Sequence, residues 1–293
     1  MVEPTVGVVV LTQGTRPEAL TQAVESVRSQ EGVQVTIVVV GNGWDPACAD
    51  PALPSDVIRV ALPENLGIPA GRNRGVDRAQ GQWLFFLDDD ALLPESTFLR
   101  DAIAVFERDP SLGMLQPRIE DPQARVQPRR WVPRIRKNNP SRSSPVFSVI
   151  EMAILMPRAT FDATGGWAEP FFYAHEGIDL AWKVWDHSQR VWYCGDLVVH
   201  HPAVSPTRHA EYFRLNARNR VWLARRNLPM VLIPLYVGSW TGIQLVRWWR
   251  KPSIVRVWFG GWRDGWREYP GARTPLRWKT VWRMTRAGRP PII

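Results

Sequence analysis

Short apolar runs of strand length alternate with amphipathic stretches through the first two thirds of the chain. Residues 7–11 form one such run, and apolar residues from Leu20 to Val27 then recur at the spacing of one helix face. Residues 35–40 and 82–87 form two further runs. This alternation predicts stacked strand–helix–strand units, and therefore an α/β fold with a largely parallel sheet.

Polar or charged residues follow each of these runs. They are Thr12 and Gln13, then Asn42, and finally Asp88, Asp89 and Asp90. In open sheets of parallel strands, ligands bind in the crevice beyond the carboxyl ends of the strands. We therefore expect the three strand ends to point to one crevice.

Three successive carboxylates after an apolar run repel one another unless a cation or hydrogen bonds hold them. Carboxylate oxygens suit Mg²⁺ or Mn²⁺, and either ion would bridge the phosphates of a nucleotide. The alternative is a solvated acidic turn that only caps the helix near Pro94 and Glu95. Segment 64–75 favours the ion, because its glycines allow close backbone approach and Arg72 or Arg74 can meet a phosphate.

Together these motifs resemble the inverting family 2 glycosyltransferases of the GT-A fold. That pattern is an apolar strand, an Asn-Gly strand end, an N-x-G…R-N-x-G segment and a D-x-D motif, here at residues 8–11, 42–43, 65–75 and 88–90. The resemblance implies a mixed, mostly parallel sheet flanked by helices. It also implies a nucleotide-diphospho-sugar donor, UDP- or dTDP-linked, and Mg²⁺ or Mn²⁺ as cofactor.

The resemblance assigns the donor side of the site. Nucleotide-sugar binding falls to Leu11, Thr12, Gln13, Arg16, Asn42, Asn65, Gly67, Gly71, Arg72, Asp88 and Asp89, and metal binding to Asp88 and Asp90. One departure is Gly41, which stands where the family commonly has an Asp that contacts the nucleotide. Nucleotide recognition would then depend on Gln13, Asn42 or Asp45.

On the acceptor side, the similar motifs stand at residues 165–172 and 176–184. The family's E-D pair supplies the catalytic base, but here it reads Glu176-Gly177, which leaves Glu176 or Asp179 for that role. We favour Glu176 as the base and expect Asp179, on the same helix face, either to support the site from behind the reacting groups or to contact the acceptor. The alternative is that Asp179 only pairs with Lys183, four residues further on. The expected acceptor contacts are Trp167, His175 and Glu176.

Residues 198–205 resemble a family segment, V-x-H-x-x-G-x-S, whose histidine often ligates the metal. A lone histidine after an apolar strand is more often a packed residue, but this chain has two in tandem. We expect His200 to be the ligand, with His201 as the alternative at the same strand end.

Charge is distributed unevenly along the chain. The total is 37 Lys+Arg against 28 Asp+Glu, or +9, but residues 1–204 carry 19 against 25 and residues 205–293 carry 18 against 3. The second part also holds nine of the 16 Trp. Trp favours the membrane interface and Arg attracts anionic lipid, so residues 205–293 are expected to form helices on an anionic membrane surface. Residues 228–246 are uncharged, but their Pro and Gly content disfavours a membrane crossing.

These patterns also predict the domain organisation. Residues 1–204 form the catalytic domain, with a nucleotide-sugar half at about 1–120 and an acceptor half at about 145–204. Residues 121–144, rich in Pro and Arg, are either a mobile basic loop that closes over the donor or acceptor, or a simple surface loop. Cys48 and Cys194 lack metal-site spacing, and the N-terminal residues lack a signal-peptide pattern, so we expect a reducing cytoplasm.

The predicted function is transfer of a sugar, with inversion, to a polyprenyl-diphosphate-linked saccharide at the cytoplasmic face of the cell membrane. Similar enzymes are rhamnosyl- and galactofuranosyltransferases of cell-wall or surface-polysaccharide assembly, and the sequence leaves a homo-oligomer open. One alternative is a sugar nucleotidyltransferase, although residues 13–17 resemble its Gly-rich loop only weakly. Another is a non-enzymatic protein that stacks single-stranded nucleic acid on its aromatic residues. No nucleic-acid motif is recognisable, so we expect no such partner.

Overall fold

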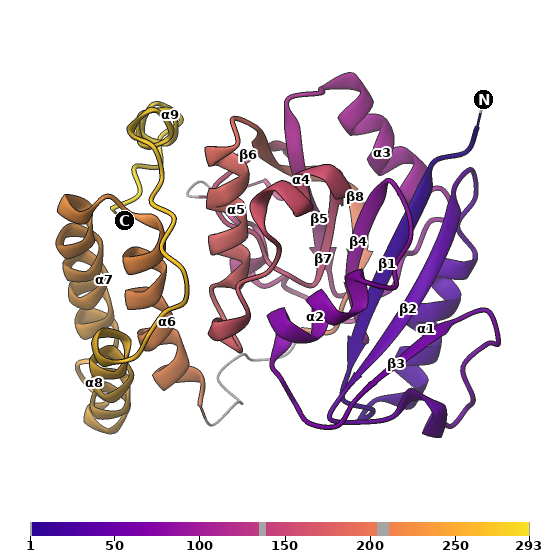
Figure 1. Ribbon diagram of the computed structural model, residues 1–293, viewed down its shortest axis with the longest axis horizontal. Coiled ribbons are helices and arrows are strands. Elements are labelled where there is room, and N and C mark those ends of the chain that lie inside the picture. Colours follow the sequence, from indigo (N-terminus) through magenta and orange to yellow (C-terminus); the bar gives the residue numbers. More distant parts are fainter. Residues whose placement is uncertain (1, 135–138, 204–210, 293) are drawn as a thin grey trace.

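A mixed sheet lies at the centre of the molecule (Figure 1). The computed structural model describes residues 2–134, 139–203 and 211–292. The strands are β1 (Thr5–Thr12), β2 (Gln34–Asn42), β3 (Ile58–Leu62), β4 (Trp83–Asp88), β5 (Leu112–Glu120), β6 (Ser144–Val146), β7 (Ala153–Pro157) and β8 (Arg190–His200). Their order across the sheet is β3-β2-β1-β4-β7-β5-β8-β6.

Most neighbouring strands run parallel. β1 pairs in parallel with β2 and β4, β2 with β3, and β5 with β8, whereas β7 runs antiparallel to β4 and β5, and β6 antiparallel to β8. The predicted mixed, mostly parallel α/β sheet is therefore confirmed. Because β7 lies next to β4, the residues just before β7 lie beside the acidic turn that ends β4.

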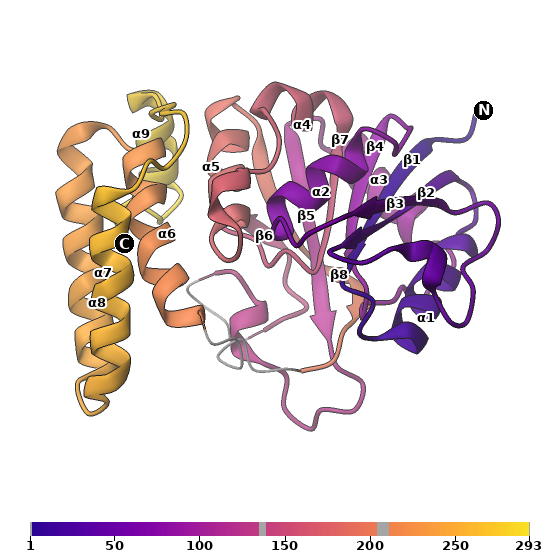
Figure 2. The ribbon, with the colours of Figure 1, turned by 60° about the horizontal axis from the view of Figure 1, so that its bottom comes forward.

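Helices cover both faces of the sheet, as Figure 2 shows. α1 (Pro17–Arg28) and α3 (Phe98–Arg108) pack on one face, and α2 (Ile68–Val76), α4 (Arg158–Thr164) and α5 (Glu176–Asp186) on the other. Along β1 the side chains alternate, so that Val8 and Val10 meet α1 and α3 while Val9 meets the opposite layer. Removing each of these valines from water stabilises the fold by roughly 1.5–3 kcal/mol.

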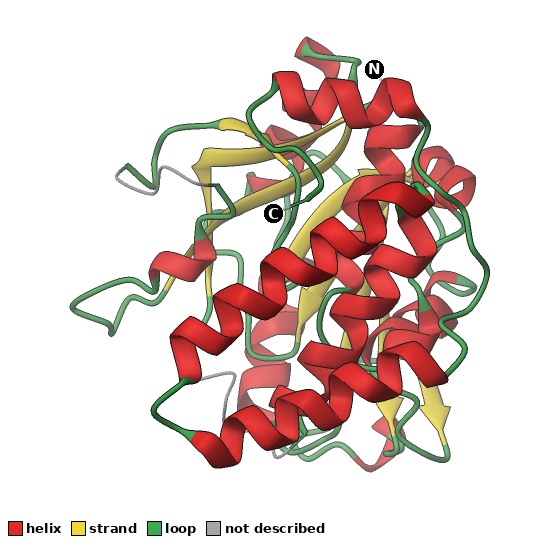
Figure 3. Cartoon of the chain, turned by 90° about the vertical axis from the view of Figure 1, so that its left-hand side faces the viewer, coloured by secondary structure: helices red, strands yellow, loops and turns green. Residues whose placement is uncertain are grey.

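The C-terminal helices lie beside α5 (Figures 1 and 2), and the view from that side has helices in front of the sheet (Figure 3). They are α6 (Tyr212–Asn227), α7 (Ile233–Trp248), α8 (Pro252–Arg267) and α9 (Trp278–Arg286), and short 3₁₀ turns occupy η1 (Pro46–Cys48), η2 (Arg129–Trp131), η3 (Glu169–Phe171) and η5 (Met230–Leu232). Trp182 of α5 and Trp222 of α6 belong to one apolar cluster. The core therefore continues from the sheet into the C-terminal helices. The predicted boundary after residue 204 falls in 204–210, outside the described residues.

The apolar stretch within residues 228–246 forms η5 and most of α7, a helix of 16 residues. Among the described residues, none of the helices combines the length and apolar character that a membrane crossing requires.

Candidate active site

An acidic turn and a histidine meet at the carboxyl ends of β4 and β8. β4 ends at Asp88, and an isolated bridge between Leu92 and His200 draws the turn against the end of β8. The Nε2 atom of His201 lies 3.0 Å from Asp90 Oδ1 and 3.9 Å from Asp88 Oδ2. Asp88, Asp90 and His201 each offer a ligand atom within 4.8 Å of the other two. Two carboxylates and an imidazole form a donor set that suits Mg²⁺ or Mn²⁺.

His201 is oriented as a metal ligand. Its Nδ1 atom lies 2.7 Å from the carbonyl oxygen of Pro202, which can only accept, so Nδ1 carries the proton and the Nε2 lone pair faces the aspartates. Burial lowers the pKa of His201, although the charge of Asp88 acts in the opposite direction. The lowered pKa favours the neutral ring that a metal ligand requires. The preference for His200 is wrong, because the grouped side chain belongs to His201 and the His200 backbone pairs with Leu92.

Arg16 and Thr12 hold the other acidic side chains of this turn. Arg16, in the loop before α1, forms ion pairs with Asp89 at 2.5 Å and with Asp90. The Thr12 hydroxyl donates to Asp89 Oδ2 at 2.6 Å. Burial raises the pKa of Asp89 and the Arg16 charge lowers it, with burial prevailing. Asp89 thus anchors the turn internally, while the half-exposed Arg16 pairs directly with Asp90, one of the grouped residues.

The buried side chain of Arg72 holds Asp88 in position. It is 1% exposed, donates from NH2 to Asp88 Oδ1 at 2.8 Å, and lies over the ring of Trp167 with its Cζ 5.0 Å from the ring centroid. The same NH2 donates to the backbone oxygen of Glu151 at 2.8 Å. Arg74, in turn, pairs with Glu169 at 3.0 Å. Arg72 therefore supports the carboxylate of Asp88, a candidate metal ligand, and does not make the contact with a phosphate that we expected.

The asparagines predicted to bind the nucleotide shape the loop before α2. Asn42 donates to Asn65 Oδ1 at 2.8 Å and accepts from the backbone of Leu66 at 2.8 Å, while Asn65 Oδ1 accepts from Gly67. Gly67 has φ +85, and an added Cβ there would lie 2.5 Å from the Phe172 carbonyl oxygen. These residues hold the loop by internal contacts.

The remaining donor-side residues lie around the end of β1. An added Cβ at Gly71 would lie 2.5 Å from Leu11 Cδ1, so the absence of a side chain lets α2 pack closely on β1. Thr12 is buried and Gln13 is exposed. Of the predicted donor contacts, Gln13 and Arg16 are thus among those that solvent reaches.

A pair of glutamates lies at the start of α5. Glu176, the first residue of α5, is 2% exposed, and burial together with the nearby Glu151 charge raises the pKa of Glu176 to about 8. Its Oε2 atom has no hydrogen-bond partner among the described residues. Glu151, which lies just before β7, accepts from the backbone nitrogen of Gly177 at 2.9 Å. Burial also raises the pKa of Glu151, against the effects of Arg72 and Gly177.

Asp179 has a structural role. It is 0% exposed and accepts from Asn227 at 2.7 Å, and it forms ion pairs with Lys183 at 3.0 Å and Arg226 at 3.1 Å. The predicted contact between Asp179 and an acceptor is therefore wrong. The alternative pairing with Lys183 is confirmed, and partners on α6 extend it.

Two further acceptor contacts are also corrected. Trp167 is 2% exposed and packs edge-on against Phe86, with ring centroids 5.1 Å apart. His175 is 8% exposed, its Nε2 lies 3.2 Å from the backbone oxygen of Asn216, and burial lowers its pKa well below 6.5. Neither ring is free to meet an acceptor, because each is enclosed by the fold.

Part of the basic segment belongs to the core rather than to a surface loop. Trp131 of η2 is 2% exposed and lies edge-on to the His201 ring, with centroids 6.0 Å apart. Trp131 of this segment therefore forms part of the wall beside the candidate metal ligand His201. Residues 135–138, which belong to the predicted mobile loop, lie outside the described residues.

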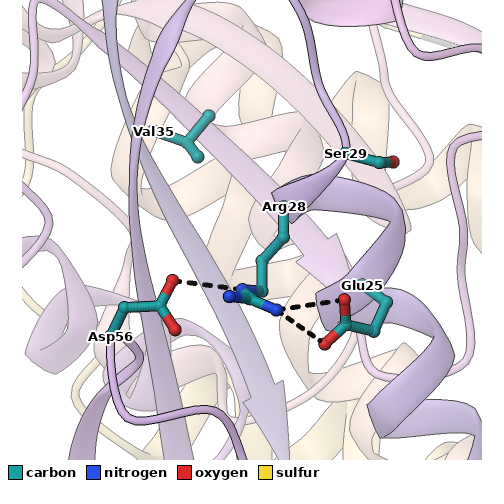
Figure 4. Close-up of a pocket in the computed structure, with 5 residues that line it drawn as sticks. All are labelled: Glu25, Arg28, Ser29, Val35 and Asp56. Atoms are coloured by element: carbon teal, nitrogen blue, oxygen red, sulfur yellow. Dashed lines mark hydrogen bonds and ion pairs between the residues drawn. The ribbon is translucent and has the colours of Figure 1, made fainter.

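The pocket in Figure 4 lies elsewhere. It is lined by Glu25, Arg28, Ser29, Val35 and Asp56. Arg28 lies 3.1 Å from Asp56 and 3.1 Å from Glu25. Val35 is the second residue of β2, so this hollow stands at the amino ends of the strands, opposite the acidic turn. The charged side chains that line this hollow form a network of ion pairs at the surface.

Comparison with known proteins agrees with this fold and site. A family model described as Glycosyl transferase family 2 matches residues 7–168, more than half of the chain. The succinoglycan biosynthesis protein ExoO of Rhizobium meliloti (strain 1021) is 39% identical over 84 residues, which cover 27% of this chain and 24% of that protein. The chain thus matches about a quarter of this curated relative.

Solved structures show the same fold at low identity. GalNAc-T7 with UDP, GalNAc and Mn²⁺ superposes with a TM-score of 0.60 at 14% identity, over 80% of this chain and 50% of that chain. The mannosyltransferase PcManGT from Pyrobaculum calidifontis, in complex with GDP-Man and Mn²⁺, has a TM-score of 0.56 at 18% identity, over 75% and 63%. S. aureus TarS 1-349 with UDP-GlcNAc gives 0.58 at 14%, over 89% and 80%.

The fold, together with an acidic turn at its strand ends, defines a glycosyltransferase of the GT-A class. The chain belongs to glycosyl transferase family 2. This assignment favours sugar transfer over the two alternatives considered from the sequence, a nucleotidyltransferase and a nucleic-acid-binding protein.

Proposed function

We propose that this protein transfers a sugar from a nucleotide-diphospho-sugar, with inversion, to a lipid-linked saccharide acceptor on a membrane surface. The part of this proposal that concerns the sugar donor, its donor half, depends on one observation. Asp88, Asp90 and His201 are grouped at the strand ends of a family 2 fold. Solved neighbours of this fold contain UDP, UDP-GlcNAc or GDP-Man, two of them with Mn²⁺. A UDP- or dTDP-linked donor remains our expectation.

Asp88, Asp90 and His201 would hold Mg²⁺ or Mn²⁺, which stabilises negative charge on a leaving diphosphate when bound. The chain's own residues support this arrangement. Arg72 fixes one oxygen of Asp88, and the Pro202 carbonyl fixes the tautomer of His201. Arg16 pairs with Asp89 and Asp90 and is half-exposed, so its guanidinium can turn from these carboxylates to a donor phosphate.

Transfer with inversion also needs a group that takes the proton of the acceptor hydroxyl. The sequence predicts Glu176 for this role. The structure pairs it with Glu151 at the start of α5, and the raised pKa of Glu176, about 8, keeps the Glu176 carboxyl protonated near neutral pH. We assign the proton acceptor to this glutamate pair.

A panel of UDP-, dTDP- and GDP-linked sugars tests the donor half. Binding is measured by calorimetry with and without Mn²⁺, and turnover by release of nucleoside diphosphate. At least one donor should bind only with the metal and release nucleoside diphosphate rather than pyrophosphate. Failure of every donor to bind in the presence of Mg²⁺ or Mn²⁺ would contradict the proposal.

The C-terminal helices supply the reason for a membrane acceptor. Large apolar side chains are exposed along them: Met230, Val231, Leu235, Leu245, Val246, Trp249, Val257, Phe259, Trp266, Tyr269, Trp278 and Trp282. We call this set the C-terminal apolar surface. Val246 is 78% exposed and Trp249 67%, and exposed Arg247 and Arg250 lie beside them on the chain. Exposed Trp and Arg in alternation suit an interface with anionic lipid, where the rings enter the headgroup region and the guanidinium groups stay with phosphate.

Flotation with vesicles tests the membrane half independently of the donor. The protein should float with phosphatidylglycerol vesicles and much less with phosphatidylcholine vesicles, and added salt should release it. The double variant Val246→Ser/Trp249→Ser should lose flotation, while Ile58→Ser on β3 serves as a control for removal of an exposed apolar residue. Equal flotation of all variants, or binding to single-stranded oligonucleotides in place of vesicles, would contradict it.

A further inference from the structure

Gly177 and Glu151 share one place in the fold. Gly177 is the second residue of α5, and its backbone nitrogen donates to Glu151 Oε1 at 2.9 Å. An added Cβ at position 177 would lie 2.3 Å from that oxygen and 2.7 Å from Glu151 Cδ. A real Cβ atom cannot approach a heavy atom this closely. The carboxyl group of Glu151 therefore occupies the space that a side chain at position 177 would need.

We propose that Glu151 is the catalytic base of this enzyme, and that its carboxylate stands in for an acidic side chain that position 177 does not carry. This inference rests on the proposed sugar transfer. It assigns the reaction's proton acceptor to a residue 26 positions before Gly177, in the turn that precedes β7.

The backbone around Glu151 ties the residue to the metal-ligand turn. The register of β4 and β7 pairs Leu87 with Ala153, and the Asp88 nitrogen extends this pairing by donating to the Met152 carbonyl oxygen at 2.9 Å. Arg72 joins the same two segments, because one NH2 group contacts both Asp88 Oδ1 and the Glu151 backbone oxygen. Backbone contacts thus hold the Glu151 segment against the turn that would bind the donor diphosphate, while the Glu151 carboxyl contacts the first turn of α5.

The two glutamates of the pair differ in access and in partners. Glu151 is partly exposed, whereas Glu176 is 2% exposed. Glu151 accepts a hydrogen bond from the Gly177 N–H, one of the N-terminal groups of α5 that have no partner within the helix, and the helix dipole there favours an anion. Glu176 Oε2 has no hydrogen-bond partner in the described part of the chain. Geometry thus makes Glu151 the accessible member, and the Gly177 N–H group and the helix dipole stabilise its carboxylate against the burial that raises its pKa.

The chemical step balances with this assignment. The O–H bond of the acceptor hydroxyl breaks and its proton passes to a Glu151 carboxylate oxygen. The hydroxyl oxygen forms the new bond to the anomeric carbon on the side opposite the diphosphate. The bond between that carbon and the phosphate oxygen breaks, and its electron pair leaves with the nucleoside diphosphate.

Moving the carboxylate from position 151 to position 177 tests the assignment in the whole 293-residue chain. We compare the wild type with Glu151→Gln, Glu151→Ala, Gly177→Asp and the double variant Glu151→Ala/Gly177→Asp. Turnover is nucleoside diphosphate release from the tightest donor of the panel, with Mn²⁺ and water as the acceptor. Affinity for the donor and the melting temperature are measured on the same samples.

Glu151→Gln should lower turnover by about 10²–10⁴-fold while donor affinity stays within about threefold of wild type. Gln keeps an oxygen that accepts from Gly177, so a merely structural role would survive this change. Gly177→Asp alone should turn over more slowly than wild type, because the new side chain would collide with the carboxyl group of Glu151. The double variant should recover at least tenfold over Glu151→Ala, since the deletion makes room for Asp and Asp restores a carboxylate.

Two results would overturn the assignment. One is turnover of Glu151→Gln within threefold of wild type. The other is a double variant that binds the donor but turns over no faster than Glu151→Ala. Failure of the wild type itself to bind any donor would instead reject the proposed function, because that result does not depend on Glu151.

Discussion

Asp179→Ala should destabilise the protein strongly, because this carboxylate is the counter-charge of a buried network. Asp179 is 0% exposed and its partner Arg226 is 7% exposed on its side chain. Removing the carboxylate leaves the Arg226 charge buried, apart from its contact with the Pro270 carbonyl. The loss of one partner of a buried ion pair costs about 3–5 kcal/mol.

This free energy converts to a measurable change in melting temperature. At about 2–4 °C per kcal/mol for chains of roughly this size, the variant should melt about 6–20 °C below wild type. Asp56→Ala is the control, because Asp56 pairs with Arg28 on the surface and is 58% exposed on its side chain. That variant should melt with the wild type, since exposed pairs contribute little.

The pH dependence gives a second readout of the same network. Burial alone would raise the pKa of Asp179, but Lys183, Arg226 and Asn227 together lower it below its ordinary value of 3.8. A lowered pKa stabilises the folded state above the ordinary pKa and loses this effect as the pH falls through the lowered value. The gap between wild type and Asp179→Ala should therefore shrink below about pH 4. Equal melting of Asp179→Ala and Asp56→Ala at pH 7 would refute the reasoning.

Three more predictions concern the acidic site. Glu176→Gln should raise the melting temperature increasingly between pH 4.5 and 8, because the folded chain holds a proton at Glu176 that the unfolded chain releases; thermal melts across this range test the slope. Arg72→Met should bind Mn²⁺ more weakly in calorimetry and melt lower, because Asp88 loses its partner. His201→Ala should weaken Mn²⁺ binding by at least tenfold, whereas His200→Ala should not; equal effects would contradict the assigned ligand.

Local patterns predicted much of the fold and of the metal ligands. β1, β2 and β4 follow from apolar runs, and the acidic turn follows from three carboxylates directly after one of them. Such features depend on neighbours in the sequence, so a reader of the sequence can find them. The choice between His200 and His201 could not be made this way, because it depends on which side chain of a strand end faces β4.

Contacts between distant segments explain what sequence reasoning missed. Glu151 gains its place from the antiparallel pairing of β7 with β4, and a lone acidic residue before an apolar run was the only local signal. Trp131 lies in a segment rich in Pro and Arg, yet its ring is buried beside His201. Trp167 and His175 belong to motifs of the family, but the motif alone could not tell that packing encloses both rings.

The most direct test of the central claim is calorimetric binding of a nucleoside diphosphate, with and without Mn²⁺, to wild type and Asp90→Asn. Asn keeps the size of Asp but removes one of the two carboxylates grouped with His201. We predict that the wild type binds at least one of UDP, dTDP and GDP only when Mn²⁺ is present. Asp90→Asn should lose this binding, while its melting temperature without metal stays at or above that of wild type. Metal-independent binding, or equal metal-dependent binding by both proteins, would contradict it.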